Sequence, residues 1–426
     1  MTNINPTPEL KIVVAHPGKQ HSYRLAEALN KACLLYQYIT TVYDNGSSPW
    51  MRIIKKVISE KDLKRANSRS SALIPQDKIK QFCELRGLFA LGLLRIDKKR
   101  HIYNRYNDYV ARVFAKKVAH YAIENKVNAV ICYDTSAQYC FDILKKKAPN
   151  IIRIIDNAAM NRYGLFKLYQ QIDAKYKILE DKTGFKNYLL EEKKAIKYRD
   201  EAFSADYHIV ASSFSKYTLT SIGIGNDSVA VIPYGVDTSR IQQKSDYSLT
   251  GKLKILYVGE LSPQKGIYSL IKAIETVNEN VEFHVVGSGL KMLSMENQNK
   301  LKNNCIFHGY MLQEDLFKLY SMCDVFLFPS LGDGFGFVVI EAMSAGMPVI
   351  CSTNSVGSDA IRNNENGFTF QAGDNNEMIK KILYFVENRF EVERMGRKSA
   401  ELAKEYTWEA YDKAVQGFVK NVIQRS

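Results

Sequence analysis

The chain has 426 residues, of which 46% are hydrophobic, 11% aromatic and 24% charged. A chain of this length and composition suits two globular domains of roughly 200 residues each, and it is neither disordered nor fibrous. Its formal net charge of +14 raises the question of an anionic partner.

The cysteines and the first residues bear on the cellular compartment. Seven cysteines are scattered along the chain without any C-x-x-C pair, which favours buried reduced thiols over a disulfide framework or a zinc site. The start, MTNINPTPEL, lacks the basic and apolar parts of a signal peptide. No run of about 18 apolar residues could span a membrane. We therefore expect a cytoplasmic protein.

The first half of the chain alternates short apolar runs with helical patterns. We expect strands at residues 11–16, 129–134, 151–156 and 207–212. These runs are continuously apolar, which is typical of parallel strands covered by helices on both faces. The pattern predicts a doubly wound α/β domain, and ligands of such domains bind at the carboxyl ends of the strands.

A basic segment interrupts this half. Between Arg52 and Lys117 there are 18 lysines and arginines against six aspartates and glutamates. Within it, RGLFALGLLRIDKKR (86–100) places a short apolar run between basic residues. One interpretation is an amphipathic segment that lies on an anionic membrane surface. The other is a core helix with a solvated basic face. No motif for nucleic acid recognition accompanies the charge.

The second half repeats the same organisation. We expect strands at residues 254–259, 282–287, 325–330 and 348–352. A polar, turn-rich stretch at 232–252 separates the two halves, and the last segment, TWEAYDKAVQGFVKNVI, has the pattern of one amphipathic helix. The chain thus predicts two doubly wound parallel-sheet domains with a ligand cleft between them.

The stretch LGDGFGFVVIEAMSAGMPVI (331–350) combines a glycine-rich loop with a helix. The loop follows a buried strand and leads into the helix FVVIEAMSA, which Gly346 and Pro348 end. The free amides and the dipole of a helix N-terminus bind anions. Gly334 and Gly336 let the backbone approach a ligand closely.

Two acids flank this anion site, eight positions apart in the sequence. Glu341 lies about one turn into the helix, where its carboxylate could accept hydrogen bonds from the vicinal hydroxyls of a ribose. Asp333, in the loop, could accept hydroxyls from a second polar ring. This arrangement fits a nucleotide sugar. Alternatively, Asp333 caps a turn and Glu341 pairs with a distant arginine.

DGFGFVVIEAMSAGMPVI resembles the acid-x7-acid motif of the retaining glycosyltransferases of family 4, which have the GT-B fold of two Rossmann-like domains facing a cleft. The family usually has glutamate at both ends, whereas the first acid here is Asp333. The likeness runs from ADYHIVASSFS (205–215) onward, and residues 11–31 fit the family's first strand, loop and helix only loosely. Further similar segments follow the expected order: IPYGVD (232–237), VGELSPQKG (258–266), VVGSGL (285–290), HGY (308–310), PSLGDGFG (329–336), NGFTF (366–370) and YTWEAY (406–411).

The resemblance implies an acceptor-side domain at 1–234 and a nucleotide-sugar-binding domain at 235–408. A terminal helix at 409–426 would pack back on the first domain. Glu341 would hold the donor ribose, and Asp333 the donor sugar. The sugar and diphosphate would meet the backbone of the loop and helix start, formed by Gly334, Phe335, Gly336, Phe337 and Val338.

VGELSPQKG resembles the family's phosphate-binding turn, in which Gly259 would lie against the donor. Lys265 would neutralise the diphosphate, as a positioned point charge does well. The family commonly has arginine where this chain has Glu260. Because a carboxylate repels a diphosphate, we expect Glu260 to turn away or to bind another group.

In the first domain the family often has a histidine at the end of the strand matching 151–156. Here Asp156 occupies that place and Asn157 follows. Either could touch the donor sugar, and Asp156 could equally be a structural cap. His16 and Lys19, in the loop after the first strand, would face the acceptor, although a lone histidine is more often structural.

The resemblance implies a retaining transferase that moves a sugar from a nucleotide-diphosphate sugar to a saccharide acceptor. No nucleophile stands out, so we expect front-side attack. No D-x-D occurs, so we expect no metal and no other cofactor. A basic protein on the inner face of the cytoplasmic membrane suits a polyprenyl-diphosphate-linked acceptor in capsule, exopolysaccharide or O-antigen assembly. A nucleotide-sugar epimerase or hydrolase, or a non-catalytic subunit of a transferase complex, are the alternatives.

Overall fold

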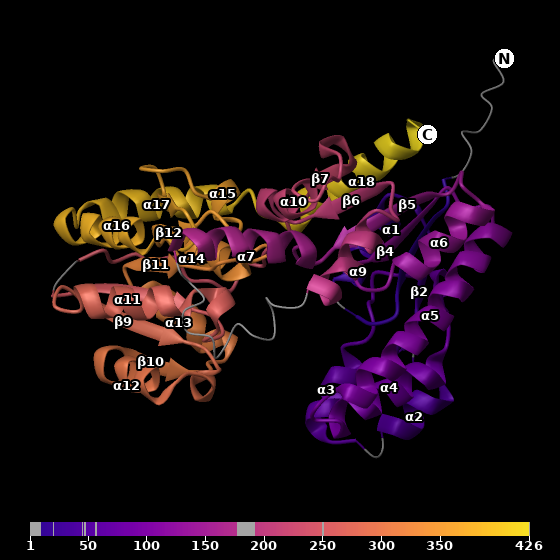
Figure 1. Ribbon diagram of the computed structural model, residues 1–426, viewed down its shortest axis with the longest axis horizontal. Coiled ribbons are helices and arrows are strands. Elements are labelled where there is room, and N and C mark those ends of the chain that lie inside the picture. Colours follow the sequence, from indigo (N-terminus) through magenta and orange to yellow (C-terminus); the bar gives the residue numbers. More distant parts are fainter. Residues whose placement is uncertain are drawn as a thin grey trace.

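A computed structural model describes residues 10–19, 21–44, 46, 48–55, 58–176, 192–248 and 251–425. The expectation that there is no signal peptide concerned the first residues, and residues 1–9 lie outside the described part of the chain. The protein consists of two lobes that lie side by side, each built on one parallel sheet (Figure 1).

The first sheet has seven parallel strands in the order β3-β2-β1-β4-β5-β6-β7. This order places the first strands in the middle and winds outward in both directions, as in a Rossmann fold. The strands are β1 (Ile12–His16), β2 (Leu35–Thr40), β3 (Ile79–Gln81), β4 (Ala129–Tyr133), β5 (Ile152–Asn157), β6 (Tyr207–Val210) and β7 (Val229–Val231).

The second sheet has six parallel strands in the order β10-β9-β8-β11-β12-β13, which repeats the same topology. Its strands are β8 (Leu253–Val258), β9 (Val281–Val286), β10 (Ile306–Gly309), β11 (Val325–Phe328), β12 (Val349–Ser352) and β13 (Gly367–Phe370). Every strand expected from the apolar runs is present, so the predicted pair of doubly wound domains is confirmed. The strands not expected, β2, β3, β7, β10 and β13, are short or contain polar residues.

Helices cover both faces of both sheets, as the continuous apolar strands require. The first lobe contains α1 (Ser22–Lys31), α2 (Pro49–Lys55), α3 (Glu60–Asn67), α4 (Glu84–Ile96), α5 (His101–Glu124), α6 (Gln138–Lys147), α7 (Arg162–Tyr176), α9 (Glu192–Ala202) and α10 (Ser213–Thr220). The remainder contains α11 (Ile267–Val277), α12 (Met295–Asn304), α13 (Gln313–Met322), α14 (Phe337–Ser344), α15 (Gly357–Ala360), α16 (Asn375–Glu387), α17 (Glu391–Ala403) and α18 (Trp408–Gln424).

Two helices cross between the lobes. Helix α18 follows the second sheet but lies on the first lobe, where Lys31 Nζ is 2.6 Å from Asp412 Oδ2 and Gln416 Nε2 donates to the carbonyl of Ala28 at 2.8 Å. Helix α7 extends toward the second lobe, where Tyr169 and Ile172 pack against Leu331. The expected boundary at 234 lies between β7 and β8, and the boundary at 408 lies at the start of α18.

The basic segment 52–117 forms most of a helical extension, α2 to α5, at the lower right of Figure 1. No helix in the described part of the chain is long and apolar enough to cross a membrane. All seven cysteines are free thiols, but the expectation that they are buried holds for only four of them: Cys33 is exposed, and Cys83 and Cys305 are half-buried. The described residues also contain no cluster of His, Cys, Asp and Glu suited to a metal ion.

Candidate functional site

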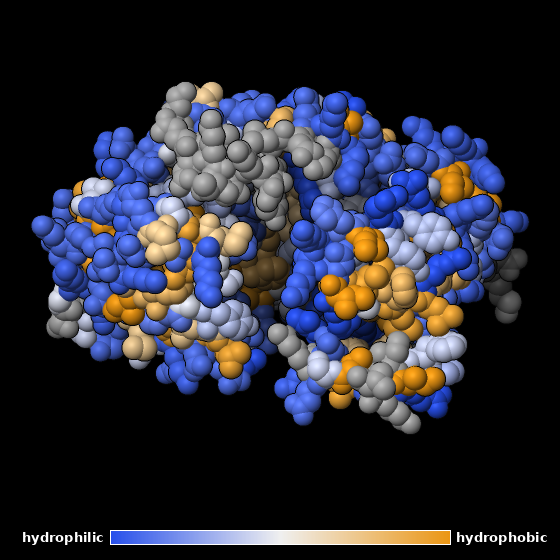
Figure 2. Space-filling model, turned by 60° about the horizontal axis from the view of Figure 1, so that its bottom comes forward, coloured by the Kyte–Doolittle hydropathy of each residue, from blue (hydrophilic) through white to orange (hydrophobic). Residues whose placement is uncertain are grey.

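A cavity of ≈ 390 Å³ lies between the two lobes. The groove that separates the lobes is visible in Figure 2. Both domains line the cavity, at the carboxyl ends of β5, β8 and β11 and at the start of α1. The lining residues are His21, Ala158, Ala159, Met160, Tyr234, Val258, Gly259, Lys265, Phe328, Asp333, Gly334, Phe335, Gly336, Phe337 and Val338.

The glycine-rich loop forms one wall of the cavity. Asp333 Oδ1 accepts from the amide of Phe335 at 3.1 Å, so the loop turns back on itself before α14 begins. Gly336 precedes the helix with φ +87°, a left-handed conformation that favours glycine. The first turn of α14, with Phe337 and Val338, therefore opens into the cavity. The sequence predicts an anion site at this helix N-terminus.

The other domain holds this loop in place. The hydroxyls of Ser212 and Ser215, at the start of α10, donate to the carbonyl of Gly334 at 2.7 and 2.9 Å. Since both serines are buried, these bonds are shielded from water. The position of the loop in the cavity therefore depends on contacts between the domains.

Lys265 provides a cation beside the glycine-rich loop. It ends a short turn, Pro263–Lys265, and its ammonium group forms an ion pair with Asp333 in the cavity wall. Gln264 fixes this turn to the loop, because its carbonyl accepts from the Leu331 amide at 2.8 Å and its side chain donates to the Gly332 carbonyl at 2.9 Å. Lys265 is thus held where an anion at the α14 N-terminus could reach it.

Glu341 lies outside the lining of the cavity, one helical turn beyond Val338 on the same face of α14. Its Oε2 accepts from the hydroxyl of Tyr320 at 3.1 Å. Burial raises the pKa of Glu341, and hydrogen bonds from Tyr320 and Gln313 oppose that shift. A half-buried carboxylate beside the cavity remains suited to accept hydroxyl groups of a ligand that extends along α14.

We expect the affinity for a nucleoside diphosphate to fall about tenfold as the pH drops through the raised pKa of Glu341. A raised pKa means that the carboxylate is protonated at a higher pH than an ordinary glutamate, and the neutral acid accepts hydrogen bonds poorly. Calorimetric titration with UDP between pH 5 and 8 measures this. Glu341→Gln corrects for titration of the nucleotide itself. An equally steep pH dependence in Glu341→Gln would contradict the expectation.

Gly259 and Glu260 have different environments. Gly259 lines the cavity, whereas Glu260 is exposed and does not line it. The side-chain stem of Glu260 lies toward Gly289, because a Cβ built on that glycine would be 3.7 Å from Glu260 Cγ. Glu260 thus lies outside the cavity that Lys265 lines, in agreement with the expectation that it turns away.

Asp156 lies behind the cavity instead of in its wall. It is 1% exposed, on the face of β5 that packs toward α1 and α18. Burial raises the pKa of Asp156 to about 7. The side-chain amide of Asn157 donates to the carbonyl of Ile209 at 3.1 Å. The residues that come after β5 in the chain, Ala158 to Met160, line the cavity on this side. Asp156 itself therefore does not reach a ligand in the cavity.

His16 and Lys19 do not line the cavity either. His16 is buried, its Nδ1 accepts from the Gly18 amide at 2.7 Å, and its ring contacts Tyr133 edge-on at 5.0 Å. Lys19 lies beside the ring of Tyr23, with Nζ 6.0 Å from the centroid, and burial followed by the charge of Arg69 lowers its pKa. These contacts hold the loop after β1.

His21 is one of the lining residues that the sequence analysis did not identify. Its ring packs on Tyr234 at 4.8 Å and on Phe337 at 5.8 Å between centroids. Burial lowers the pKa of His21, which favours a neutral imidazole at neutral pH. Its place just before a predicted helix was the available signal, but no local pattern indicates which way the side chain points.

Comparison with known proteins bears on the family and the fold. Residues 239–402 match the family model "Glycosyl transferases group 1". The capsular polysaccharide biosynthesis glycosyltransferase CapM of Staphylococcus aureus is 28% identical over 232 residues, 51% of this chain and 60% of that protein. The phosphatidyl-myo-inositol mannosyltransferase of Mycobacterium leprae is 30% identical over 195 residues, 43% of this chain and 51% of that protein. The chain spans about half the length of the curated relatives it matches.

The solved structures resemble the whole chain. HepE of Anabaena, solved in complex with UDP, superposes with a TM-score of 0.59 at 14% identity and covers 97% of this chain and 100% of that one. The predicted GT-B fold is therefore confirmed. Residues 239–402 match the glycosyl transferases group 1, and they contribute Lys265 and the glycine-rich loop to the cavity. The chain as a whole has the fold of GT-B glycosyltransferases.

Proposed function

We propose that this protein is a retaining glycosyltransferase of family 4 that moves a sugar from a nucleotide-diphosphate sugar to a saccharide acceptor. The observation that carries the proposal is the cavity between the domains, in which Lys265 and the N-terminus of α14 converge on one anion site. Asp333 forms an ion pair with Lys265 and accepts a hydrogen bond from the Phe335 amide in the loop before α14. The match of residues 239–402 to the glycosyl transferases group 1 supports the reaction class.

The donor would lie with its diphosphate at the start of α14. A diphosphate there would accept hydrogen bonds from the helix amides and from the Lys265 ammonium. Lys265 would then contact the phosphates in place of part of its present contact with Asp333. Asp333 is then available to accept hydroxyls of the sugar, and Glu341 those of the ribose. The similar HepE structure holds UDP, which supports a nucleotide donor of this kind.

The transfer breaks the bond between the anomeric carbon and the phosphate oxygen and forms one to the acceptor oxygen. Negative charge develops on the departing diphosphate, where Lys265 and the helix N-terminus stabilise it. The acceptor hydroxyl attacks from the side of the leaving group, so configuration is retained, and its proton goes to the departing diphosphate. We propose no metal and no other cofactor in this step, because Lys265 supplies the compensating charge.

We further propose a lipid-linked saccharide acceptor, such as one carried on polyprenyl diphosphate. The reaction would take place on the inner face of the cytoplasmic membrane, during assembly of a capsule, an exopolysaccharide or an O-antigen. The names of the CapM and phosphatidyl-myo-inositol mannosyltransferase relatives support a surface polysaccharide or lipid context. The basic segment 52–117 would provide the attraction to anionic lipids.

The experiment that tests the donor site is calorimetric titration of UDP, GDP and ADP into the wild type, Lys265→Ala and Glu341→Ala. We expect one nucleotide to bind best, and each substitution to weaken it about tenfold because a charge-assisted contact is lost. If no nucleotide binds to the wild type, the non-catalytic subunit becomes the better explanation. Incubation with a nucleotide sugar but no acceptor separates the remaining alternative, because an epimerase would yield a new sugar nucleotide.

A further inference from the structure

Exposed large apolar side chains are concentrated in two segments, one in each domain. Among the described residues, only Phe203, Tyr217 and Phe390 of this class lie elsewhere. The segment 50–109 contains Trp50, Ile53, Leu73, Leu85, Phe89, Ile96, Ile102 and Tyr109. The segment 292–322 contains Met292, Met295, Ile306, Tyr310, Leu312 and Met322. Such clustering marks interaction surfaces, whereas single exposed apolar residues need no explanation.

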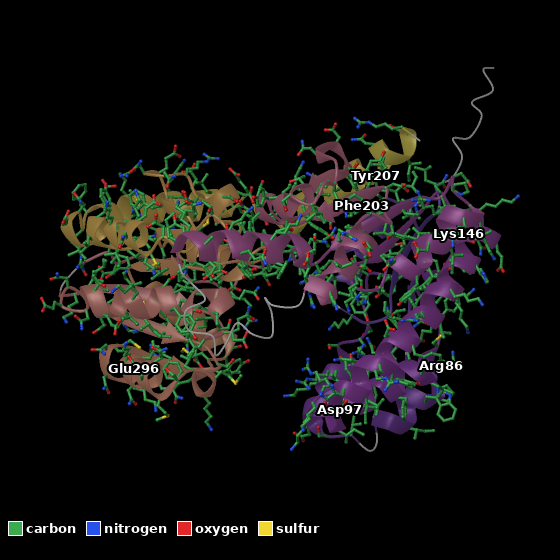
Figure 3. The ribbon with its side chains drawn as sticks, in the orientation of Figure 1. Arg86, Asp97, Lys146, Phe203, Tyr207 and Glu296 are labelled. Atoms are coloured by element: carbon green, nitrogen blue, oxygen red, sulfur yellow. The ribbon has the colours of Figure 1, made fainter. Side chains whose placement is uncertain are left out.

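Both segments lie at the same edge of the molecule. In Figure 1, α2, α3 and α4 form the lower end of the first lobe, and β10 and α12 form the lower end of the second. The labelled residues Asp97 and Glu296 mark these two ends in Figure 3. Figure 2 looks onto this edge and shows apolar patches on both lobes, on either side of the groove. We call this surface the two-lobed face.

Helix α4 buries only two of its residues fully. The residues it buries are the small ones, Gly87 and Ala90, and a Cβ on Gly87 would be 2.7 Å from the hydroxyl oxygen of Thr41. Its large residues Leu85, Phe89 and Ile96 are exposed, Ile96 to 76%, whereas its other leucines are half-buried. A helix that leaves three large apolar side chains exposed gains little stability from them in this chain. The alternative of a core helix for 86–100 therefore accounts for its half-buried leucines but not for Leu85, Phe89 and Ile96.

The charge around these side chains indicates what covers them. Phe89 contacts Tyr106 of α5 edge-on at 5.0 Å, and the Arg86 guanidinium lies 5.5 Å from the ring centroid of the exposed Tyr109. The surrounding segment, 52–117, has a threefold excess of basic over acidic residues, 18 against six. Apolar and aromatic side chains interleaved with arginine and lysine match the interface of an anionic bilayer, where rings enter the headgroup layer and cations meet phosphates.

We propose that the two-lobed face docks on an anionic membrane surface, with both domains in contact and the groove facing the lipid. The docking is peripheral, because α4 extends about 20 Å, less than the hydrocarbon core that a spanning helix must cross. The basic first lobe provides electrostatic attraction, and the second lobe adds apolar contacts. This inference builds on the lipid-linked acceptor proposed above, whose saccharide would enter the groove directly from the membrane.

Vesicle cosedimentation tests the docking with the full chain and vesicles of phosphatidylcholine alone or mixed with phosphatidylglycerol, which supplies the anionic surface that attracts basic segments. We expect binding to the anionic vesicles only. The pairs Phe89→Ser with Ile96→Ser and Met292→Ser with Leu312→Ser should each weaken it about tenfold, since each removes two inserted side chains. Phe390→Ser, an exposed residue outside both segments, is the matched control and should bind as the wild type does.

Fluorescence adds a direct readout of insertion. The chain has two tryptophans, and Trp50 belongs to the two-lobed face. Brominated lipids should quench wild-type emission but not that of Trp50→Phe. Met295→Trp in the Trp50→Phe background should restore quenching through the second lobe. If Met295→Trp is not quenched, or if the second-lobe pair binds normally, docking by both lobes is wrong.

Two further outcomes would overturn the proposal. Equal binding to neutral and anionic vesicles would remove the electrostatic part. A dimer in light scattering that the same substitutions dissociate would assign the face to protein contacts. UDP titration without vesicles keeps this test separate from the proposed function. A chain that docks but binds no nucleotide would disprove the donor site, and one that binds UDP but not vesicles would disprove only the docking.

Discussion

Lys265→Ala should lower the turnover of the donor about 100- to 1,000-fold, the usual effect of removing one group that stabilises charge in a transition state. Lys265 lies in the cavity wall, and in the unliganded site its ammonium is paired with Asp333. The charge on the departing diphosphate grows as the sugar–phosphate bond breaks. The loss should therefore appear mainly in kcat and less in KM.

The measurement is release of the nucleoside diphosphate from the donor sugar nucleotide identified by titration, in the presence of acceptor or as slow hydrolysis without it. Lys272→Ala is the matched control, because Lys272 is exposed on α11, the helix that follows the Lys265 turn, and does not line the cavity. Turnover of Lys265→Ala within threefold of the control would show that another group compensates the diphosphate charge.

Gly266→Ala should destabilise the second domain by at least about 3 kcal/mol and abolish nucleotide binding. Gly266 has φ +75°, which disfavours any side chain, and a Cβ built there would lie 1.9 Å from the carbonyl oxygen of Pro329. The Lys265 turn and the end of β11 therefore touch at this glycine. Any movement that relieves the overlap separates Lys265 from the glycine-rich loop.

Gly309→Ala is the control that separates backbone strain from steric overlap. Gly309 has φ +67°, and a Cβ on it would meet nothing within 4 Å. Only the conformational cost of about 1–2 kcal/mol should remain there. Urea unfolding of both variants and calorimetric titration with UDP measure the difference. Similar losses of unfolding free energy in the two variants would mean that the contact between Gly266 and Pro329 can relax without cost.

Local patterns were sufficient to predict an anion site at the glycine-rich loop, because the loop and the helix after it depend on residues close in sequence. The place of Lys265 beside this loop was predicted only from the resemblance to family 4. The strands expected from apolar runs are all present, since these runs are also local in sequence. The polar or short strands β2, β3, β7, β10 and β13 have no such run, and their pairing depends on neighbours far along the chain.

Local sequence patterns could not predict which way the side chains at the strand ends point. Asp156, His16 and Tyr133 share one face of the first sheet because of their alternation along parallel strands. That face is covered by α1 and by α18, which returns from the end of the chain. The sequence could place Asp156 at the carboxyl end of a strand, but only this packing decides that it lies behind the cavity and that His21 enters it.

By itself the sequence determined two doubly wound domains, a basic segment and a glycine-rich loop at a helix N-terminus, and its resemblance to family 4 predicted Lys265 beside that loop. The tertiary structure alone decided which residues of the first domain reach that site, because one continuous core joins α1 and α18 of the first lobe to α14 of the second. It also decided that the apolar residues of 50–109 and 292–322 are left outside the core. The physical reason is that burial is shared among elements distant in sequence, so periodicity within one segment cannot show which of its faces is covered.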